Sequence, residues 1–369
     1  MVFVWIALGL VIIAVAGLLL YRAYLQRRIR NQSKRLIAAG GISSVEEVRL
    51  GGLKQYVLIQ AEDASKPVLL VLHGGPGMPV PGVGCRGVDW VFNLSTAELI
   101  KHFTVVFWDQ RGTGKTYAAE TPASSMNMEQ FLTDASELTD WLRARFQTDK
   151  IFLSGVSWGS IIGIQLAHRY PDKFHAYIGI AQIVNWAESD QIAYEWLLGR
   201  AQETNNAKAL AELKAMGLPP YTEDIAKWNQ LRKWLFMLGG LIYEDGQIRH
   251  PGMPYLFKTL LASPDYKIGD VIRTFTKGMK LSYSPQMLAD FGSYDALSGI
   301  RRLDLPVCFF HSLHDRTISG KLLQQFYERL EAPQGKHLTW LEQSAHIYSP
   351  ADSRLVEKGV IEFKTNLHV

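Results

Sequence analysis

The sequence is poor in cysteine and has little excess of either charge. Its 369 residues include only Cys85 and Cys308, too few for a disulfide framework, and free thiols are typical of a reducing compartment. The chain has 39 basic against 35 acidic residues, and no internal repeat or low-complexity segment. With 47% apolar residues, it can bury a large core, which excludes a disordered protein.

Charge is absent from the first twenty residues, MVFVWIALGLVIIAVAGLLL. At about 1.5 Å per residue, a helix of this length spans roughly 30 Å of hydrocarbon. A cleaved signal peptide would need a basic region before the apolar run, where only Met1 stands. We therefore expect residues 1–21 to be an uncleaved, single-pass transmembrane anchor.

Acidic residues are absent from the segment that follows, residues 21–35, which contains Arg22, Arg27, Arg28, Arg30, Lys34 and Arg35. Positive flanks stay in the cytoplasm, so the rest of the chain is predicted to be cytoplasmic. Without these six, 33 basic residues face 35 acidic ones, and nucleic acid is not an expected partner. The tract suits anionic lipid headgroups, or it acts as a topology signal alone. Residues 22–47 are expected to form a basic juxtamembrane linker.

A phosphate-binding loop is absent despite the triplet Gly114-Lys115-Thr116. Such a loop needs a glycine five residues before the Gly-Lys pair, and Asp109 stands there, where its carboxylate would repel a phosphate. The pair His311 and His314 lacks the further ligands of a metal site. We therefore expect no nucleotide, no metal and no other cofactor.

Short apolar runs alternate with helical patterns along most of the chain. Residues 48–60 read as a hairpin around a Gly-Gly turn. The later runs are typical of strands buried on both faces: Pro67–His73, Thr104–Asp109, Lys150–Val156, His175–Ala181 and Pro306–His311. This alternation predicts an α/β fold with a mostly parallel sheet and helices on both faces.

The pattern becomes mostly helical between Asn185 and Asp290. We expect residues 185–290 to be an inserted helical cap, residues 48–184 the first part of the core, and residues 291–369 its second part. Tryptophans are scattered through the cap: Trp186, Trp196, Trp228 and Trp234. They are typical of the cap's own packing, and one side of them could also form a substrate wall.

A serine within a G-x-S-x-G motif follows the third buried run. Gly155 and Gly159 flank Ser157, with a predicted strand before the motif and a helical pattern after it. This strand-turn-helix context is required for a nucleophile elbow, in which the glycines avoid collisions around a strained serine. Ser157 is therefore the candidate nucleophile.

A serine nucleophile needs a histidine base, and the base needs a carboxylate that orients it. The expected chain order is serine, acid, histidine. Asp315 and His346 each follow a predicted buried strand, which places them at the carboxyl edge of the sheet. His337 precedes its strand and would lie at the opposite edge. Asp315 and His346 are therefore the candidate acid and base.

Glycines also follow the first buried run, in HGGPG, residues 73–77. They permit a tight loop whose backbone N–H groups approach a tetrahedral oxyanion, together with the N–H of Trp158.

Three motifs together, HGGPG (73–77), DQRGTG (109–114) and GVSWG (155–159), resemble the proline iminopeptidases of the α/β-hydrolase superfamily. The resemblance extends from about Val48 to the C-terminus. It implies the α/β-hydrolase fold, Ser157, Asp315 and His346 as catalytic residues, and Gly75 and Trp158 as oxyanion donors. It also implies that Lys115 and Thr116 are a surface continuation of a structural loop.

These features predict a serine hydrolase, with an aminopeptidase for small peptides as the leading hypothesis. An aminopeptidase must bind the α-ammonium of its substrate through carboxylates. Glu188 and Glu195, seven residues apart at the start of the cap, are candidates, although a solvated helix face explains them equally well. The alternatives are a membrane-associated carboxylesterase or acylglycerol hydrolase, and a non-catalytic binding protein on the same fold.

Overall fold

An eight-stranded sheet forms the centre of the protein in the computed structural model, which describes residues 1–222, 224–245 and 247–369. The strand order is β1-β2-β4-β3-β5-β6-β7-β8. β2 pairs antiparallel with β1 and β4, and all other neighbours are parallel. The strands are β1 Ile42–Leu50, β2 Leu53–Ala61, β3 Val68–Leu72, β4 Thr104–Asp109, β5 Ile151–Val156, β6 Phe174–Ile180, β7 Val307–Ser312 and β8 Lys336–Leu341. The predicted α/β fold with a mostly parallel sheet is confirmed.

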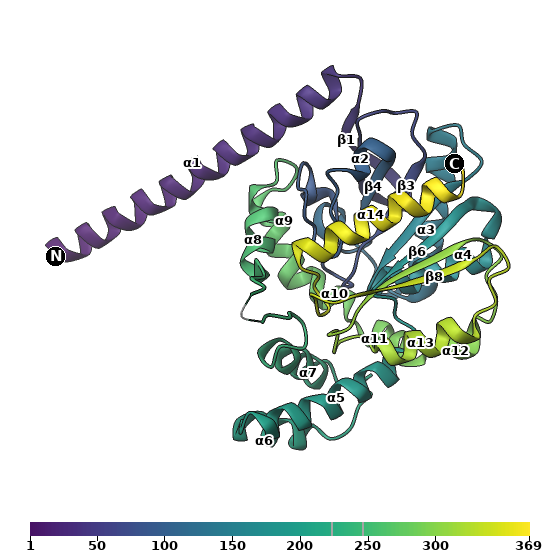
Figure 1. Cartoon of the computed structure of the whole chain (residues 1–369). Coiled ribbons are helices and arrows are strands. Elements are labelled where there is room, and N and C mark those ends of the chain that lie inside the picture. The colour runs from purple at the N-terminus through teal and green to yellow at the C-terminus, as the bar shows by residue number, and fades with distance from the viewer. Residues whose placement is uncertain (223, 246) are drawn as a thin grey trace.

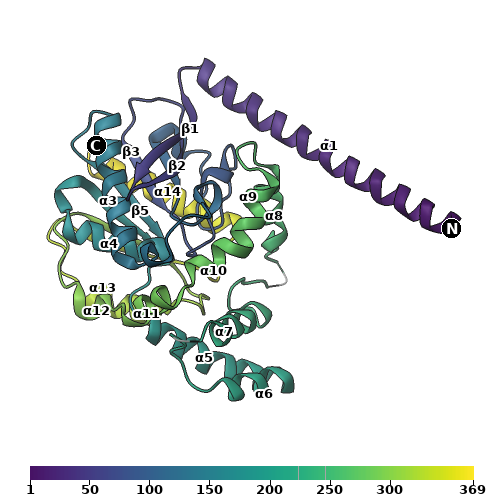
Figure 2. The same ribbon diagram turned by 180° about the vertical axis from the view of Figure 1, so that it is seen from behind.

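Helices cover both faces of the sheet, because β3 to β7 are apolar on both sides (Figures 1 and 2). One apolar core includes side chains of α3, α4 and α13, and a second includes side chains of α2 and α14. The helices outside the cap are α2 Leu99–His102, α3 Met128–Arg145, α4 Trp158–Arg169, α12 Ala296–Gly299, α13 Gly320–Arg329 and α14 Pro350–Asn366. Short 3-10 turns occupy η1 Val83–Cys85, η2 Gly114–Thr116, η3 Ala123–Ser125 and η4 Pro171–Lys173.

The N-terminal helix α1, Val2–Ala38, is continuous through the basic tract and projects from the body of the molecule (Figure 1). Residues 22–38 of the expected juxtamembrane linker are therefore helical, and β1 begins at Ile42, earlier than the hairpin expected from residue 48. The reason is local, since no glycine or proline interrupts residues 18–39 and arginine, leucine and glutamine are good helix formers. Gly40, at φ +94°, then ends the helix. The apolar part of α1 is long enough to cross a membrane and is not buried against the rest of the chain.

The segment 185–290 is helical, as its pattern indicates, but it divides into two groups. Side chains of α5, α6, α7 and α11 pack into the same core as α3 and α4, whereas side chains of α8 and α9 pack into the core of α2 and α14. In Figure 1, α8 and α9 lie beside α1, and α5 to α7 form a separate lobe. The helices are α5 Trp186–Glu203, α6 Ala207–Met216, α7 Ile225–Met237, α8 Gly252–Ala262, α9 Ile268–Arg273, η5 Thr274–Gly278, α10 Met279–Ser282 and α11 Pro285–Ser293.

A buried ion pair connects the loop after β4 to α3. The Arg111 guanidinium donates from Nε and Nη2 to the two carboxylate oxygens of Asp134, at 2.9 and 2.8 Å, and both side chains are almost completely buried. Asp134 also accepts hydrogen bonds from Gln55 and Gln130. Because its partners surround the carboxylate, the pair holds the loop in one position.

We expect Asp134→Ala to lower the free energy of unfolding by about 3–5 kcal/mol, because it leaves the Arg111 charge buried without a partner. Urea unfolding of the full chain, followed by near-UV circular dichroism, measures the change. Asp140 on the same helix is half exposed and bonds to Arg143 and Lys173, so Asp140→Ala is a control that should cost less than about 1 kcal/mol. Equal losses in the two variants would contradict the role given to the buried pair.

Candidate active site

Ser157 stands in a strained turn between β5 and α4. β5 ends at Val156, α4 begins at Trp158, and Ser157 itself has φ +51° and ψ −118°. A Cβ atom on Gly155 would lie 2.5 Å from the carbonyl oxygen of Gly159, and one on Gly159 would lie 2.2 Å from that of Leu72. Only glycine fits at either position, for the steric reason anticipated from the motif.

The carboxyl edge of the sheet brings Ser157, His346 and Asp315 together. The Oγ of Ser157 is 3.0 Å from Nε2 of His346, and Nδ1 of His346 is 2.8 Å from Oδ2 of Asp315. Oδ1 of Asp315 accepts hydrogen bonds from the backbone N–H groups of Thr317 and Ile318. Burial raises the pKa of Asp315, but His346 and the backbone donors outweigh it and hold this pKa below its ordinary value. The carboxylate is thus charged and fixed against the imidazole.

The HGGPG loop lies against the serine. A Cβ atom on Gly74 would be 3.3 Å from the Cβ of Ser157, and Gly75 has φ +115°, a conformation that favours glycine. Gly74 and Gly75 both line the cavity in front of Ser157. Trp158 begins α4, so its N–H has no acceptor within the helix. Of the two expected oxyanion donors, Gly75 lines the cavity and Trp158 directly follows the serine.

His73 and Gln110, which were not among the predicted site residues, hold the HGGPG loop and Trp158 in place. The backbone N–H of Gln110 donates to Nε2 of His73, and its side-chain oxygen accepts from Nε1 of Trp158 at 2.8 Å. Nδ1 of His73 donates to the carbonyl of Gly74, so the ring is neutral, and burial lowers its pKa to about 4. The three motifs of the sequence thus meet in one network. The only sign of this network in the sequence is that all three motifs are present, because His73, Gln110 and Trp158 follow the ends of three different strands.

The Gly-Lys-Thr triplet belongs to a loop held by Asp109. The buried carboxylate of Asp109 accepts from the backbone N–H groups of Val83 and Lys115 and from the hydroxyl of Tyr266. Burial raises the pKa of Asp109 to about 7, against these three bonds that lower it. Thr116 is buried and its hydroxyl accepts from the N–H of Tyr56, so this segment is not the surface continuation that the resemblance implied. The carboxylate of Asp109 thus accepts the hydrogen bond from the Lys115 backbone N–H, a group that a phosphate-binding loop would direct at its ligand.

The cavity in front of Ser157 measures about 290 Å³ and is mainly apolar. Its walls come from the core and from both groups of cap helices: Gly74, Gly75, Met78, Val80, Phe92, Asn93, Val156, Ser157, Trp186, Trp228, Asn229, Arg232, Leu241, Met253, Met279, Tyr283, Thr317, Ile318, His346 and Ile347. We call it the catalytic pocket. Two of the four cap tryptophans, Trp186 and Trp228, line it, so they serve both packing and the pocket wall.

Glu188 and Glu195 do not reach the catalytic pocket. Both are exposed on α5 and neither lines it, because α5 turns the face carrying Trp186 toward the core and the opposite face toward water. Among the described residues, no acidic side chain lines the pocket, whereas Arg232 does. Arg232 pairs with the buried Asp190 and lies 4.7 Å from the ring centre of Trp228. Sequence reasoning missed this cation, which has no distinguishing motif.

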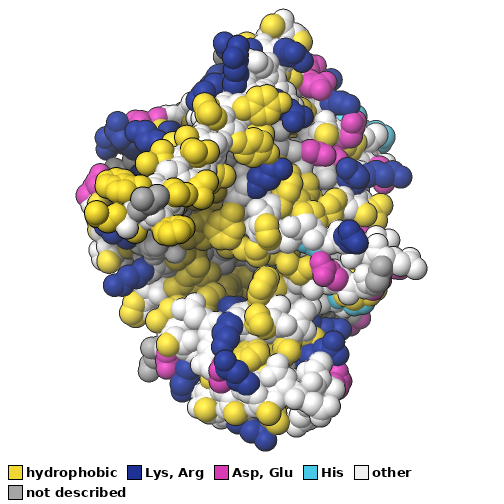
Figure 3. All heavy atoms as spheres, turned by 90° about the vertical axis from the view of Figure 1, so that its left-hand side faces the viewer, with side chains coloured by type: hydrophobic (Ala, Val, Ile, Leu, Met, Phe, Trp, Pro, Cys, Tyr) yellow, Lys and Arg dark blue, Asp and Glu magenta, His cyan; other side chains and the backbone are white. Residues whose placement is uncertain are grey.

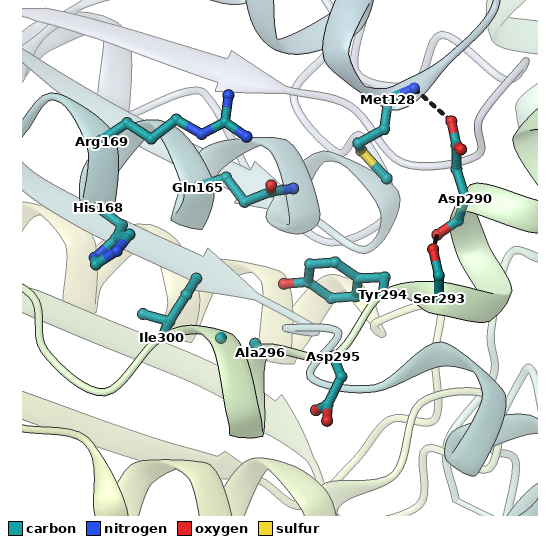
Figure 4. A pocket seen from close by; sticks show the side chains of 11 residues that line it. Met128, Gln165, His168, Arg169, Asp290, Ser293, Tyr294, Asp295, Ala296 and Ile300 are labelled. Carbon is teal, nitrogen blue, oxygen red and sulfur yellow. Dashed lines mark hydrogen bonds between the residues drawn. The ribbon is translucent and has the colours of Figure 1, made fainter.

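A second cavity, of about 380 Å³, lies between α4 and the segment around α11 and α12 (Figure 4). Arg169 and Gln165 come from α4, and Asp290 and Tyr294 from the opposite wall. Asp290 accepts a hydrogen bond from the N–H of Met128 and thereby caps the start of α3. None of the predicted site residues lines this cavity, and its polar groups have structural partners.

We expect Gly159→Ala to slow the reaction of Ser157 with a fluorophosphonate by about a hundredfold, because the added Cβ would displace the turn and misplace the hydroxyl. Gly199, near the C-terminal end of α5, has no atom within 4 Å of an added Cβ, so Gly199→Ala is the control and should react normally. Labelling rates under identical conditions measure both. Normal labelling of the Gly159→Ala protein would contradict the close approach described for β3 and α4.

Known proteins share this architecture. Residues 67–218 match the alpha/beta hydrolase fold family. The probable aminopeptidase YbaC of Bacillus subtilis is 31% identical over 308 residues, 83% of this chain and 91% of that protein. A proline iminopeptidase of Thermoplasma volcanium is 31% identical over 33% of this chain and 37% of its own length. Among solved structures, a membrane phospholipase A aligns over 100% of this chain and 99% of its own, with a TM-score of 0.60 and 16% identity. The chain therefore belongs to the α/β-hydrolase fold family and is related to its proline iminopeptidases and aminopeptidases.

Proposed function

We propose that this protein is a serine hydrolase that works through an acyl-enzyme on Ser157. The hydrogen-bonded chain from Ser157 through His346 to Asp315 is the observation that carries the proposal. A serine hydroxyl is a poor nucleophile, and this arrangement supplies the base and its orienting carboxylate. A binding protein on the same fold would have no need of all three groups in contact.

The proposed reaction has two halves. Oγ of Ser157 attacks the substrate carbonyl while Nε2 of His346 takes its proton, and the negative oxygen of the tetrahedral intermediate accepts from the N–H groups of Gly75 and Trp158. His346 then returns the proton to the leaving group, which departs as an alcohol or amine. In the second half, His346 activates a water molecule that hydrolyses the acyl-enzyme and releases the acid. Asp315 stabilises the imidazolium in both halves.

The walls of the catalytic pocket favour an ester with an apolar acyl group. Side chains such as Phe92, Met253 and Met279 offer an acyl chain contact without hydrogen bonds. The charged side chain among the described lining residues is Arg232, and no carboxylate among them could hold an α-ammonium group. We therefore propose a carboxylesterase or acylglycerol hydrolase activity.

An aminopeptidase is the second candidate, and the relationship to the Bacillus subtilis protein favours it. Such an enzyme must desolvate the ammonium of its substrate beside the scissile bond, which requires buried carboxylates. Asp190 is buried nearby, but its charge is already paired with Arg232. This candidate thus depends on a rearrangement of that pair.

We further propose that α1 anchors the protein in a membrane, with the hydrolase domain on the cytoplasmic side. The supporting observations are the exposed apolar run of α1 and the basic residues that follow it. We propose to divide the chain as expected from the sequence, with an anchor at 1–21 and a cap at 185–290 between core parts 48–184 and 291–369, except that the sheet begins earlier, at Ile42. Residues 22–38 continue the same helix beyond the proposed anchor.

We expect Ser157→Ala to abolish covalent labelling by a fluorophosphonate, because the acyl-enzyme cannot form without the hydroxyl. Asp315→Asn and His346→Ala should each lower turnover by about three orders of magnitude or more. Ser154, a buried serine of β5 without a hydrogen-bond partner, provides the control Ser154→Ala, which should label fully. Full labelling of the Ser157→Ala protein would refute the assignment.

The substrate preference is tested with a panel of p-nitrophenyl acyl esters and aminoacyl p-nitroanilides. We expect the purified chain to hydrolyse medium-chain esters with kcat/KM at least about tenfold higher than any aminoacyl anilide, since the pocket is apolar and has no described carboxylate for an ammonium. Glu188→Gln and Glu195→Gln should leave both activities unchanged. A preference for free-amine substrates would establish the aminopeptidase instead.

A further inference from the structure

We infer that the outer face of α8 and α9, beside α1, inserts into the interfacial layer of the membrane, and that the ester substrate is drawn from this layer. We call this face the α8–α9 ridge and define it by Phe257, Leu261, Ile268 and Ile272. The inference rests on the proposed anchoring by α1 and on the proposed esterase activity. It adds a second lipid contact, made by the folded domain itself.

Side-chain bonds clamp α1 to the turn between α8 and α9. The guanidinium of Arg22 donates from Nε to the carbonyl of Leu261 and from Nη2 to that of Tyr266, both at 2.8 Å. One turn further along α1, the buried Gln26 donates to the carbonyl of Ser263 at 2.8 Å. Arg22 is also the first charged residue after the apolar run, so it marks the level at which α1 leaves the hydrocarbon. The clamp therefore holds the α8–α9 turn at the membrane surface.

Large apolar side chains stand exposed at this level. The four residues of the α8–α9 ridge are between 39% and 58% exposed, although α8 and α9 bury other apolar residues, such as Leu256 and Val271, in the core. Figure 3 views the molecule from the side on which α1 projects, and hydrophobic side chains gather there around a hollow. Exposed apolar clusters of this kind mark interaction surfaces. The proposed anchoring by α1 makes a lipid layer the partner that this cluster would meet.

The charges around the ridge have the sign that anionic lipids attract. In the segment 251–280, the exposed charged residues are all lysines: Lys258, Lys267, Lys277 and Lys280. The two acidic residues of this segment are turned inward, Asp265 onto Arg86 and Asp270 onto Arg273. Apolar side chains interspersed with lysines are typical of surfaces that lie in the membrane interface.

Helix α8 also borders the catalytic pocket. Met253, in the first turn of α8, lines the pocket, while Phe257 and Leu261 project outward on the ridge. Met253 and Phe257 are four residues apart, so they lie on the same side of α8, one turn apart along its axis. The pocket wall and the proposed lipid contact are therefore neighbours along one helix. An acyl chain leaving the lipid layer beside α8 would reach an apolar wall, so an amphipathic ester held in the bilayer is the substrate class that fits this placement.

Depth-dependent fluorescence quenching tests the ridge without reference to activity. Both native cysteines are buried, so single cysteines at Phe257→Cys, Ile272→Cys, Leu19→Cys and Tyr170→Cys can be labelled selectively with an environment-sensitive NBD probe. The full-length variants are reconstituted in vesicles of phosphatidylcholine and phosphatidylglycerol with a nitroxide on the lipid acyl chain. Leu19 lies in the apolar run. Tyr170 is 40% exposed and directly follows α4, a helix on the other side of the molecule from α1 (Figure 1).

We expect quenching at positions 19, 257 and 272 and none at 170. Quenching at 19 alone would overturn the ridge contact and leave the anchor standing. No quenching at 19 would refute the anchor and, with it, the inference.

Charged substitutions on the ridge test the source of the substrate. We expect Phe257→Glu combined with Ile272→Glu to slow hydrolysis of a long-chain ester held in the vesicles by about tenfold, because the ridge no longer enters the interface. A water-soluble short-chain ester should be hydrolysed at the unchanged rate, and Tyr170→Glu should affect neither. Equal loss on the two esters would show a folding or catalytic defect and count against the inference. Absence of ester hydrolysis in the parent protein would refute the proposed activity but not the quenching result.

Discussion

The site depends on the close approach of backbone at Gly155, Ser157 and Gly159. The turn from β5 into α4 presses the helix against the end of β3, leaving no room for a Cβ atom at either glycine. This contact forces Ser157 into a positive φ and aims its hydroxyl out of the sheet edge toward His346. The strain is supported by a large buried core on both faces of the sheet, which a short chain could not provide.

A network of hydrogen-bonded polar side chains lies beside the turn. Gln110 bonds to both His73 and Trp158, and Arg111 with Asp134 fixes the loop that carries Gln110. In a region of low dielectric, such a network is stable only when its members find partners, and then it permits a single arrangement. His73, Gln110, Arg111 and Asp134 thereby hold the segments that carry the proposed oxyanion donors, without touching the reacting atoms themselves.

The two groups of cap helices have different relations to the rest of the chain. α5 and α7 bring Trp186, Trp228 and Arg232 over the pocket, with Asp190 holding the arginine. α8 and α9 are tied to α1 by Arg22 and Gln26 and contribute Met253 to the opposite wall. The catalytic pocket therefore lies between helices α5 and α7, which supply its charged residue Arg232, and the α8–α9 ridge, which adjoins the proposed anchor.

The sequence by itself determined the apolar helix, the parallel α/β order and the candidates Ser157, Asp315 and His346. These features are local: a run of uncharged residues, short runs buried on both faces, and chemically distinctive side chains at strand ends. It also indicated where helical structure replaces strands, although it placed a linker where good helix formers continue α1 to Ala38. Only the tertiary structure decided which cap residues face the pocket. Glu188, Glu195 and Arg232 are ordinary residues of amphipathic helices, and their orientation depends on how α5 and α7 pack against distant segments, a long-range contact that helical periodicity does not encode.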